Sequence, residues 1–358
     1  MKIQDDFVFD SLYSVGSGLV QWRSPSNIAL IKYWGKKPIQ IPSNPSLSFC
    51  LTNCFTSTKV SFVKNDKTGI NYQFFFGGKK KPKFESKLNH FFEKISKYCP
   101  YILKMKMVIE SSNSFPHSSG IASSASAFSA LSLCIMEIEN LLNPKLKKTF
   151  FFRKASFLSR LGSGSACRSI IEKFSVWGKT DLISNSSDLF ASSFNLKVHN
   201  SFNDLCDTIL IVDKSEKEFS SSKGHELMNS HIFSDKRVSQ AKSNLSRIIE
   251  AFGSGNFKLF IEVVETEALT LHAMMMTSNP HFILMKSNTL KIIKSVWEFR
   301  KKYNLKLCFT LDAGANVHLI YPKCEFDSVQ RFILEVLVGY CENGKYINDK
   351  IGMGPFKL

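Results

Sequence analysis

The sequence predicts an α+β fold divided into two lobes. Strand-like and helix-like patterns follow one another along the chain, and a polar stretch rich in serine and asparagine interrupts them near 184–203. The length of 358 residues is sufficient for two lobes with ample core. We therefore expect an N-terminal lobe at 1–190 and a C-terminal lobe at 191–358.

Alternation and short apolar runs predict the strands of the first lobe, and apolar residues three or four positions apart predict its helices. After a turn at 24–27 and a short apolar run at 28–31, strands are expected at 47–52, 58–63, 70–76 and 103–109. Helices are expected at 84–98, 128–142 and 147–161. The dipeptide Asn143-Pro144 ends the second of these helices.

The second lobe is expected to begin with a buried strand and to be rich in helices. Its strands are predicted at 208–212, 307–311 and 317–321. Its helices are predicted at 235–252, 256–275, 287–303 and 325–341. No internal repeat is visible.

The composition is that of an ordinary globular protein, 44% hydrophobic and 22% charged. The first residues include two acids and lack the apolar segment of a signal peptide, and no apolar run approaches the length of a membrane span. The nine cysteines include no C-x-x-C pair and no metal-ligand spacing. We therefore expect reduced thiols, a cytoplasmic location and no protein-bound metal.

The formal net charge of +17 suggests an anionic partner, and nucleic acid, a membrane surface or a phosphorylated small molecule would each qualify. The lysines are scattered, however, and a lysine-rich genome accounts for most of the excess. The one dense run, at 79–83, is typical of a solvated loop. We expect neither a nucleic-acid partner nor a membrane partner.

Residues 113–130 are the stretch around which the chain is organised. Small and polar residues, including Pro116 and Gly120, lead into the N-terminus of a predicted helix, where free N–H groups and the dipole favour an anion. Hydroxyl donors are supplied by Ser118, Ser119, Ser123, Ser124 and Ser126. This pattern predicts a phosphate cradle, and a serine-rich cap on an ordinary helix is the alternative.

Two further serine-glycine turns follow the cradle, at 162–169 and 220–224. The first contains Arg168, whose planar fork could hold a carboxylate or a phosphate, while a surface ion pair is the alternative. The second precedes a predicted helix.

Two charged residues are placed to face a cleft. Lys32 directly follows an apolar run, and Asp312 lies at the end of a predicted strand beside a glycine turn. A lysine that snorkels from the edge of a core is the alternative for Lys32. His272 is interpreted as a hydrogen-bonded helix residue, and the methionines at 274–276 are interpreted as core filler.

Taken together, these segments resemble the diphosphomevalonate decarboxylases of the GHMP kinase superfamily. The matching segments, in the family's order, lie at 26–36, 42–48, 113–126, 162–169, 271–278 and 312–316. Lys-Tyr-Trp-Gly-Lys at 32–36, Gly-Ser-Ala-Cys-Arg-Ser at 164–169 and Asp-Ala-Gly at 312–314 are specific to the decarboxylase branch. The cradle alone would indicate only the superfamily.

The resemblance implies an N-terminal lobe like ribosomal protein S5 domain 2, a ferredoxin-like C-terminal lobe and a homodimer. It also implies a reaction in which ATP, with Mg²⁺, phosphorylates the 3-hydroxyl of mevalonate 5-diphosphate. Loss of phosphate and carbon dioxide then gives isopentenyl diphosphate, a step of the mevalonate route to isoprenoids.

The resemblance also implies roles for single residues. Asp312 would be the general base or the orienting group at the 3-hydroxyl, Arg168 would clamp the carboxylate or nearby phosphate oxygens, and Lys32 would lie near the reacting centre. Substrate contacts are implied for Tyr33, Lys36, Ser163, Ser165 and, more weakly, Ser221. Contacts with ATP are implied for Asn113, Ser119, Gly120, Ser123 and Ser124.

The sequence departs from the family at His117, at Lys37-Pro38, at Ala315 and at 171–174, where a glycine pair is common. The last departure, which replaces the glycine pair with bulkier residues, puts close backbone packing behind Arg168 in doubt. Three other functions stay open: a related GHMP kinase without decarboxylation, a decarboxylase of mevalonate 5-phosphate, and a basic nucleic-acid-binding protein, although the aromatic-basic interleaving of RNA-binding proteins is absent.

Overall fold

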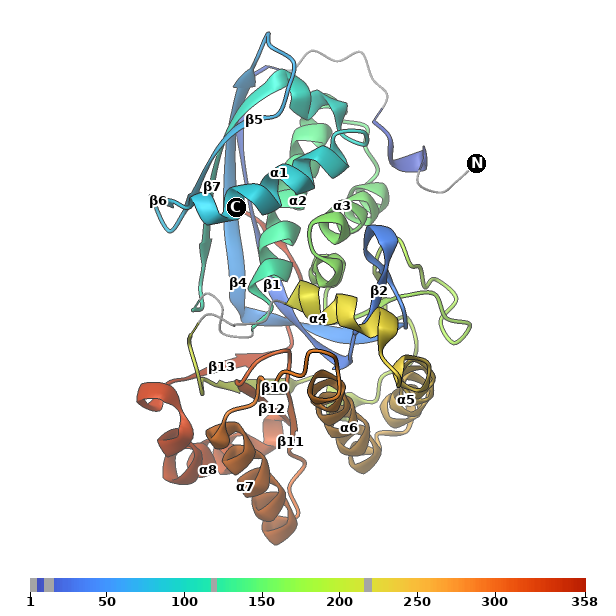
Figure 1. Ribbon diagram of the computed structural model, residues 1–358, viewed down its shortest axis with the longest axis vertical. Helices are drawn as coiled ribbons and strands as arrows, with labels where there is room; N and C mark the ends of the chain where they lie inside the picture. Colours follow the sequence, from blue (N-terminus) through green and yellow to red (C-terminus); the bar gives the residue numbers. More distant parts are fainter. Residues whose placement is uncertain (1–4, 10–15, 117–120, 216–220) are drawn as a thin grey trace.

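The computed structural model describes residues 5–9, 16–116, 121–215 and 221–358, without the side chains of Ser221 and Ser222. The chain forms two α+β lobes, one at each end of the long axis, and α4 (Ser221–Leu227) lies between them (Figure 1). The expected α+β class is therefore observed.

The first lobe is an antiparallel-rich sheet with three helices on one face (Figure 1). Its strand order is β14-β1-β4-β7-β5-β6, with β8 pairing with β4 and β9 with β8. The strands are β1 (Gly18–Ile31), β4 (Ser46–Lys64), β5 (Asn71–Phe76), β6 (Lys79–Lys80), β7 (Met105–Asn113), β8 (Phe174–Trp177), β9 (Ser192–Ser193) and β14 (Phe356–Lys357). The helices are α1 (Glu85–Ile95), α2 (Ser123–Leu142) and α3 (Lys148–Gly162), and β2 (Lys36–Lys37) and β3 (Ile41–Pro42) form a small hairpin.

Two expectations for this sheet were wrong. The turn predicted at 24–27 is part of β1, and Pro25 is tolerated there because the pairing with β4 shifts register between Pro25 and Asn27. The strands predicted at 47–52 and 58–63 are one strand, β4. Its polar middle is stabilised by Asp349 of the other lobe. The Asp349 carboxylate accepts hydrogen bonds from the backbone N–H groups of residues 52–54 at 2.7–2.8 Å.

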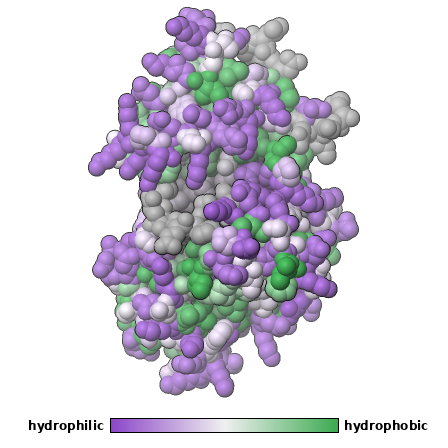
Figure 2. Space-filling view, viewed as in Figure 1, coloured by the Kyte–Doolittle hydropathy of each residue, from purple (hydrophilic) through white to green (hydrophobic). Residues whose placement is uncertain are grey.

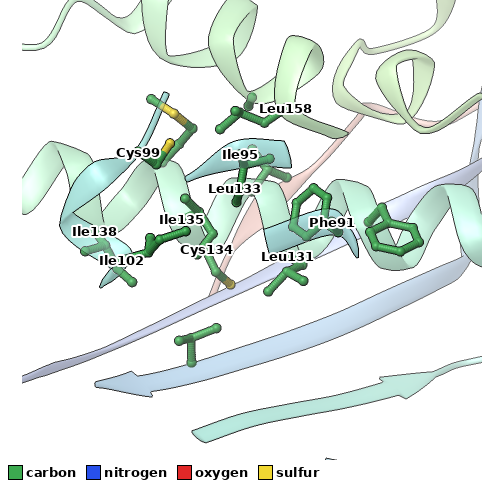
Figure 3. Packing of buried hydrophobic residues seen from close by; sticks show 14 of the residues in the cluster. Phe91, Ile95, Cys99, Ile102, Leu131, Leu133, Cys134, Ile135, Ile138 and Leu158 are labelled. Carbon is green, nitrogen blue, oxygen red and sulfur yellow. The ribbon is translucent and has the colours of Figure 1, made fainter. Parts of the chain in front are cut away.

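The core of the first lobe forms around α2. Figure 3 shows Phe91 and Ile95 of α1, Leu131 and Ile135 of α2 and Leu158 of α3 packed together. Among the described residues, α2 is the one helix long and apolar enough to cross a membrane. However, 78% of its apolar 18-residue segment is buried inside the protein. We therefore interpret α2 as a core helix.

The second lobe is a four-stranded antiparallel sheet of order β11-β12-β10-β13. Its strands are β10 (Leu205–Leu210), β11 (Cys308–Thr310), β12 (Val317–Pro322) and β13 (Tyr346–Lys350). Its helices are α4, α5 (Ser234–Ser254), α6 (Phe257–Met276), α7 (Ser287–Tyr303) and α8 (Phe326–Phe332), which continues to Tyr340 as short π and 3₁₀ segments. Hydrophilic residues dominate the face in Figure 2, as the net charge of +17 leads one to expect.

The lobes are joined at more than one place. β9 and the C-terminal β14 both belong to the sheet of the first lobe. Because β14 follows the last strand of the second lobe, the chain returns to the first lobe at its C-terminal end. The division predicted after residue 190 stays a prediction. The loop between β11 and β12 delivers Asp312 to the junction, where β1 ends.

Candidate functional site

A cavity of about 940 Å³ lies between the lobes. It gathers eight of the residues singled out from the sequence: Lys32, Tyr33, Lys36, Ser124, Ser163, Ser165, Arg168 and Asp312. The first seven come from the first lobe, and Asp312 comes from the second. The cavity is therefore complete only when the two lobes are docked.

Lys32 and Asp312 form an ion pair at the base of this cavity, with Nζ and Oδ1 3.0 Å apart. The Lys32 side chain is buried, and the Asp312 side chain is 24% exposed. The partly open carboxylate is thus the member of the pair that a ligand can reach.

The backbone of Lys32 is fixed by the second lobe. Its N–H donates to Glu267 Oε2 at 2.8 Å, and its carbonyl accepts from Arg237 Nη2 at 3.3 Å. Glu267 and Arg237 are fully buried and ion-paired with each other, and Asn44 Nδ2 adds a 3.0 Å bond to the same carbonyl. These bonds position the backbone, and the buried, ion-paired side chain excludes the snorkelling alternative.

The carboxyl of Asp312 is held in its ionised form. Burial alone would raise its pKa, but the nearby charges of Lys32, His318 and Arg168, with the Lys32 hydrogen bond, lower the pKa below the ordinary value of 3.8. His272 Nε2 donates to the Asp312 backbone carbonyl at 3.1 Å, which fits its interpretation as a hydrogen-bonded helix residue. Asp312 therefore presents a charged acceptor to the cavity.

Arg168 is buried in the 3₁₀ helix Gly164–Ile170 and is not a surface ion pair. Its Nε donates to Asn27 Oδ1 at 3.2 Å and its Nη1 to Ser46 Oγ at 2.8 Å. Within the described residues no carboxylate lies at ion-pair distance. These neutral partners orient the fork and leave its charge for an anion in the cavity.

The backbone behind Arg168 packs closely despite the departure at 171–174. Lys173 adopts a left-handed conformation, with φ of 50°. Gly354, with φ of 85°, supplies a close approach instead, because a Cβ there would lie 3.1 Å from the Glu172 Cα. The neighbouring Gly352 carbonyl accepts from the Lys173 N–H at 3.0 Å.

The Tyr33 hydroxyl is buried beside the 3₁₀ helix and has no hydrogen-bond partner among the described residues. A Cβ on Gly164 would lie 2.8 Å from this oxygen, so glycine makes room for it. Burial raises the pKa of Tyr33, the hydroxyl stays protonated, and it can donate to a ligand.

The serines lie where α3 and α2 meet. Ser124 Oγ and Ser163 Oγ are 3.2 Å apart and both line the cavity, as does Ser165. The close helix contact depends on Gly162, because a Cβ there would lie 2.3 Å from the Phe128 ring.

Asn113 and Ser123 do not line the main cavity. They line a smaller apolar cavity of about 120 Å³ that shares Ser124, Lys87 and Phe128 with it. Asn113 Nδ2 donates to Ser123 Oγ at 3.2 Å. Ser118, Ser119 and Gly120 lie outside the described residues, as does the Ser221 side chain. The backbone of Ser221 opens α4, so the turn predicted at 220–224 is wrong from that residue on.

Sequence reasoning missed the basic face of α1. Lys87, His90 and Lys94 line the cavity at steps of three and four, beside the apolar stripe of the helix, and this spacing could have revealed them. Burial, Lys36 and Arg160 lower the pKa of Lys94. Six cationic side chains and two carboxylates line the cavity among the described residues, so it favours a strongly anionic ligand.

No group of three or more His, Cys, Asp or Glu side chains within the described ranges could hold a metal ion.

Family models match nearly the whole chain in two consecutive parts. The model of the diphosphomevalonate decarboxylase-like N-terminal domain matches 24–190, and that of the mevalonate 5-diphosphate decarboxylase C-terminal domain matches 208–352.

Three relatives illustrate the similarity. The diphosphomevalonate decarboxylase of Candida albicans is 28% identical over 326 residues, 86% of this chain and 85% of that one. The crystal structure of mevalonate diphosphate decarboxylase from Staphylococcus aureus has a TM-score of 0.81 at 28% identity, covering 96% of this chain and 98% of that one. A solved structure of MDDEF in complex with MVAPP, AMPPCP and magnesium has a TM-score of 0.80 at 27% identity, covering 95% and 99%.

Proposed function

The chain belongs to the diphosphomevalonate decarboxylase family, and we propose that it converts mevalonate 5-diphosphate and ATP to isopentenyl diphosphate, ADP, phosphate and carbon dioxide. Its two-lobed α+β fold is that of the GHMP superfamily. The observation that carries the proposal is that the Lys32–Asp312 pair and Arg168 line one cavity rich in cationic side chains.

The chemistry needs a group that orients the 3-hydroxyl and charges that stabilise the leaving phosphate. Asp312, ionised and partly exposed, accepts the hydroxyl hydrogen bond and is placed to take its proton. Lys32 neutralises Asp312 and lies beside the reacting centre. Arg168 clamps the carboxylate, whose electrons move toward C3 as phosphate leaves.

The other residues implied by the resemblance are assigned to the two phosphorylated substrates. We assign Tyr33, Lys36, Ser163, Ser165 and Ser221 to mevalonate 5-diphosphate. We assign Asn113, Ser119, Gly120, Ser123 and Ser124 to the ATP phosphates. The smaller apolar cavity, lined by Phe74, Phe76 and Phe84, is suited to the adenine ring.

Magnesium enters as the ATP complex, as the MDDEF complex with AMPPCP and magnesium suggests for this family. A cytoplasmic location is also proposed and is supported by nine free cysteines. A homodimer is proposed from the family resemblance alone. We propose no nucleic-acid or membrane partner.

The test is product analysis with ATP and each mevalonate derivative. We expect carbon dioxide from mevalonate 5-diphosphate and little from the 5-phosphate. Formation of ADP with a stable 3-phosphorylated product and no carbon dioxide would place the protein in the kinase branch. Preferential release from the 5-phosphate would correct the substrate.

A further inference from the structure

His225 lies in α4 and lines the cavity, and no role has been assigned to it so far. Its ring packs against Tyr33 and Trp34, with ring centroids 4.2 and 4.6 Å away and the ring planes tilted by 35° and 40°. We propose that His225 binds a phosphate oxygen of the substrate diphosphate through its Nε2–H. This inference rests on the proposed function.

A backbone hydrogen bond fixes the tautomer of His225. The Gly35 N–H donates to His225 Nδ1 at 3.0 Å, so Nδ1 carries a lone pair and the proton of the neutral ring is on Nε2. The two aromatic neighbours restrict rotation of the ring. His225 is therefore a preorganised donor with one free N–H.

The surroundings keep this donor neutral. Burial, with the charges of Lys36 and Arg168, lowers the pKa of His225 to about 3. The donor consequently adds recognition without adding another charge to a cavity already lined by six cationic side chains.

The free N–H has no partner among the described residues and is available to a ligand in the cavity. Lys36 and Arg168 both act on His225, so the ring sits in positive potential that selects an anionic oxygen. Tyr33, whose ring centroid lies 4.2 Å from that of His225, is assigned to the diphosphate in the proposed function. The diphosphate of mevalonate 5-diphosphate is therefore the group in reach, and the ATP phosphates are the competing source.

Two amide substitutions separate the donor from the acceptor. His225→Gln places an amide donor near the position of Nε2, whereas His225→Asn retains an acceptor near Nδ1 for Gly35 and no donor at Nε2. His225→Phe keeps an aromatic ring at this position and removes both nitrogens. His281→Gln, at an exposed histidine outside the cavity, is the matched control.

Each variant is assayed for KM toward mevalonate 5-diphosphate, KM toward ATP, kcat and thermal unfolding. A hydrogen bond to a charged group predicts that His225→Asn and His225→Phe raise KM for mevalonate 5-diphosphate by ~10-fold or more, with little change in KM for ATP. His225→Gln should recover much of the loss, and His281→Gln should match wild type.

Calorimetric titration with inorganic pyrophosphate provides a readout that needs no turnover. We expect the same order of affinities, wild type above His225→Gln above His225→Asn. Equal effects of Asn and Gln, rescue by Asn alone, or a loss confined to KM for ATP would overturn the inference. If wild type binds pyrophosphate but releases no carbon dioxide, the proposed function fails while the titration still decides on His225.

Discussion

Two buried lysine–carboxylate pairs in this protein look alike but are not equivalent. Lys154 and Glu139 pair at 2.6 Å in the core of the first lobe, both essentially inaccessible. Lys32 and Asp312 pair at 3.0 Å at the lobe junction, where the carboxylate opens to the cavity. The core pair is not accessible to a ligand, and Lys154 donates a further hydrogen bond to the Tyr98 carbonyl.

The two carboxyl groups shift in opposite directions. Burial raises the pKa of Glu139 despite its bond to Lys154. At Asp312 the same effect of burial is outweighed, and the pKa is lowered, because His318 and Arg168 add to the influence of Lys32. The difference teaches that one lysine does not offset the effect of burial on the pKa of a carboxyl group, whereas the additional cations at the junction do.

The largest effect is expected from Asp312→Asn. Asparagine keeps the shape but cannot accept the hydroxyl proton, so kcat should fall by ~10²–10⁴ while the dissociation constants of both substrates change little. Steady-state kinetics and equilibrium binding measure the two parts. If Asp312 only fixes its own turn, asparagine would make the same bond and near-normal kcat in a folded protein would follow.

The core pair should show the reverse pattern. Lys154→Met leaves Glu139 buried without its partner and should destabilise the protein by ~3 kcal/mol, with kcat near wild type. Denaturant unfolding measures the loss. The double change Lys154→Met with Glu139→Gln should recover part of it, since no buried charge is then left. A large fall in kcat with unchanged stability would break the comparison.

Arg168→Lys tests the cations that distinguish the junction. A point charge cannot reproduce the planar fork held by Asn27 and Ser46, so we expect a loss of ~2–4 kcal/mol in transition-state stabilisation. The measured quantity is kcat/KM. A value within about threefold of wild type, below ~1 kcal/mol, would exclude the clamp.

The smallest effect is a change in pH dependence. Because the pKa of Asp312 is lowered, its ionised form, and the stability of its ion pair, should persist as pH falls and be lost only below its ordinary value of 3.8. Lys32→Met removes the main lowering influence, so the acid limb of residual kcat should move to higher pH. Profiles of kcat against pH are measured for wild type and Lys32→Met with the same substrates. Titration of the substrate phosphates then affects both profiles equally. An unshifted limb would mean that Lys32 does not hold Asp312 ionised.

Local pattern was enough for much of the fold. The helices predicted at 235–252, 256–275 and 287–303 are observed as α5, α6 and α7 within two residues at each end. Their apolar stripes are local properties of the sequence. The break predicted between residues 52 and 58 was wrong, because Asp349, almost 300 residues away in the chain, stabilises the continuous strand β4.

The residues of the candidate site also differ in whether a local sequence pattern marks them. Arg168 and Asp312 stand in segments with a recognisable order, and the structure brings both to one cavity. His225 carries no such signal, because only the Gly35 hydrogen bond and the ring contact with Tyr33 distinguish it from any other helix histidine. Burial of Arg168 could not be predicted either, since its partners come from two separate strands.

The separation of Lys32 and Asp312, 280 positions along the chain, has a consequence for how the protein acquires activity. Neither lobe contains the pair alone, so a refolding intermediate with one native lobe would show secondary structure and a formed core yet no turnover. Docking closes a very long loop, and this step follows local helix formation. Recovery of activity after dilution from denaturant should therefore lag behind recovery of far-UV circular dichroism, and the lag measures the assembly of the lobes.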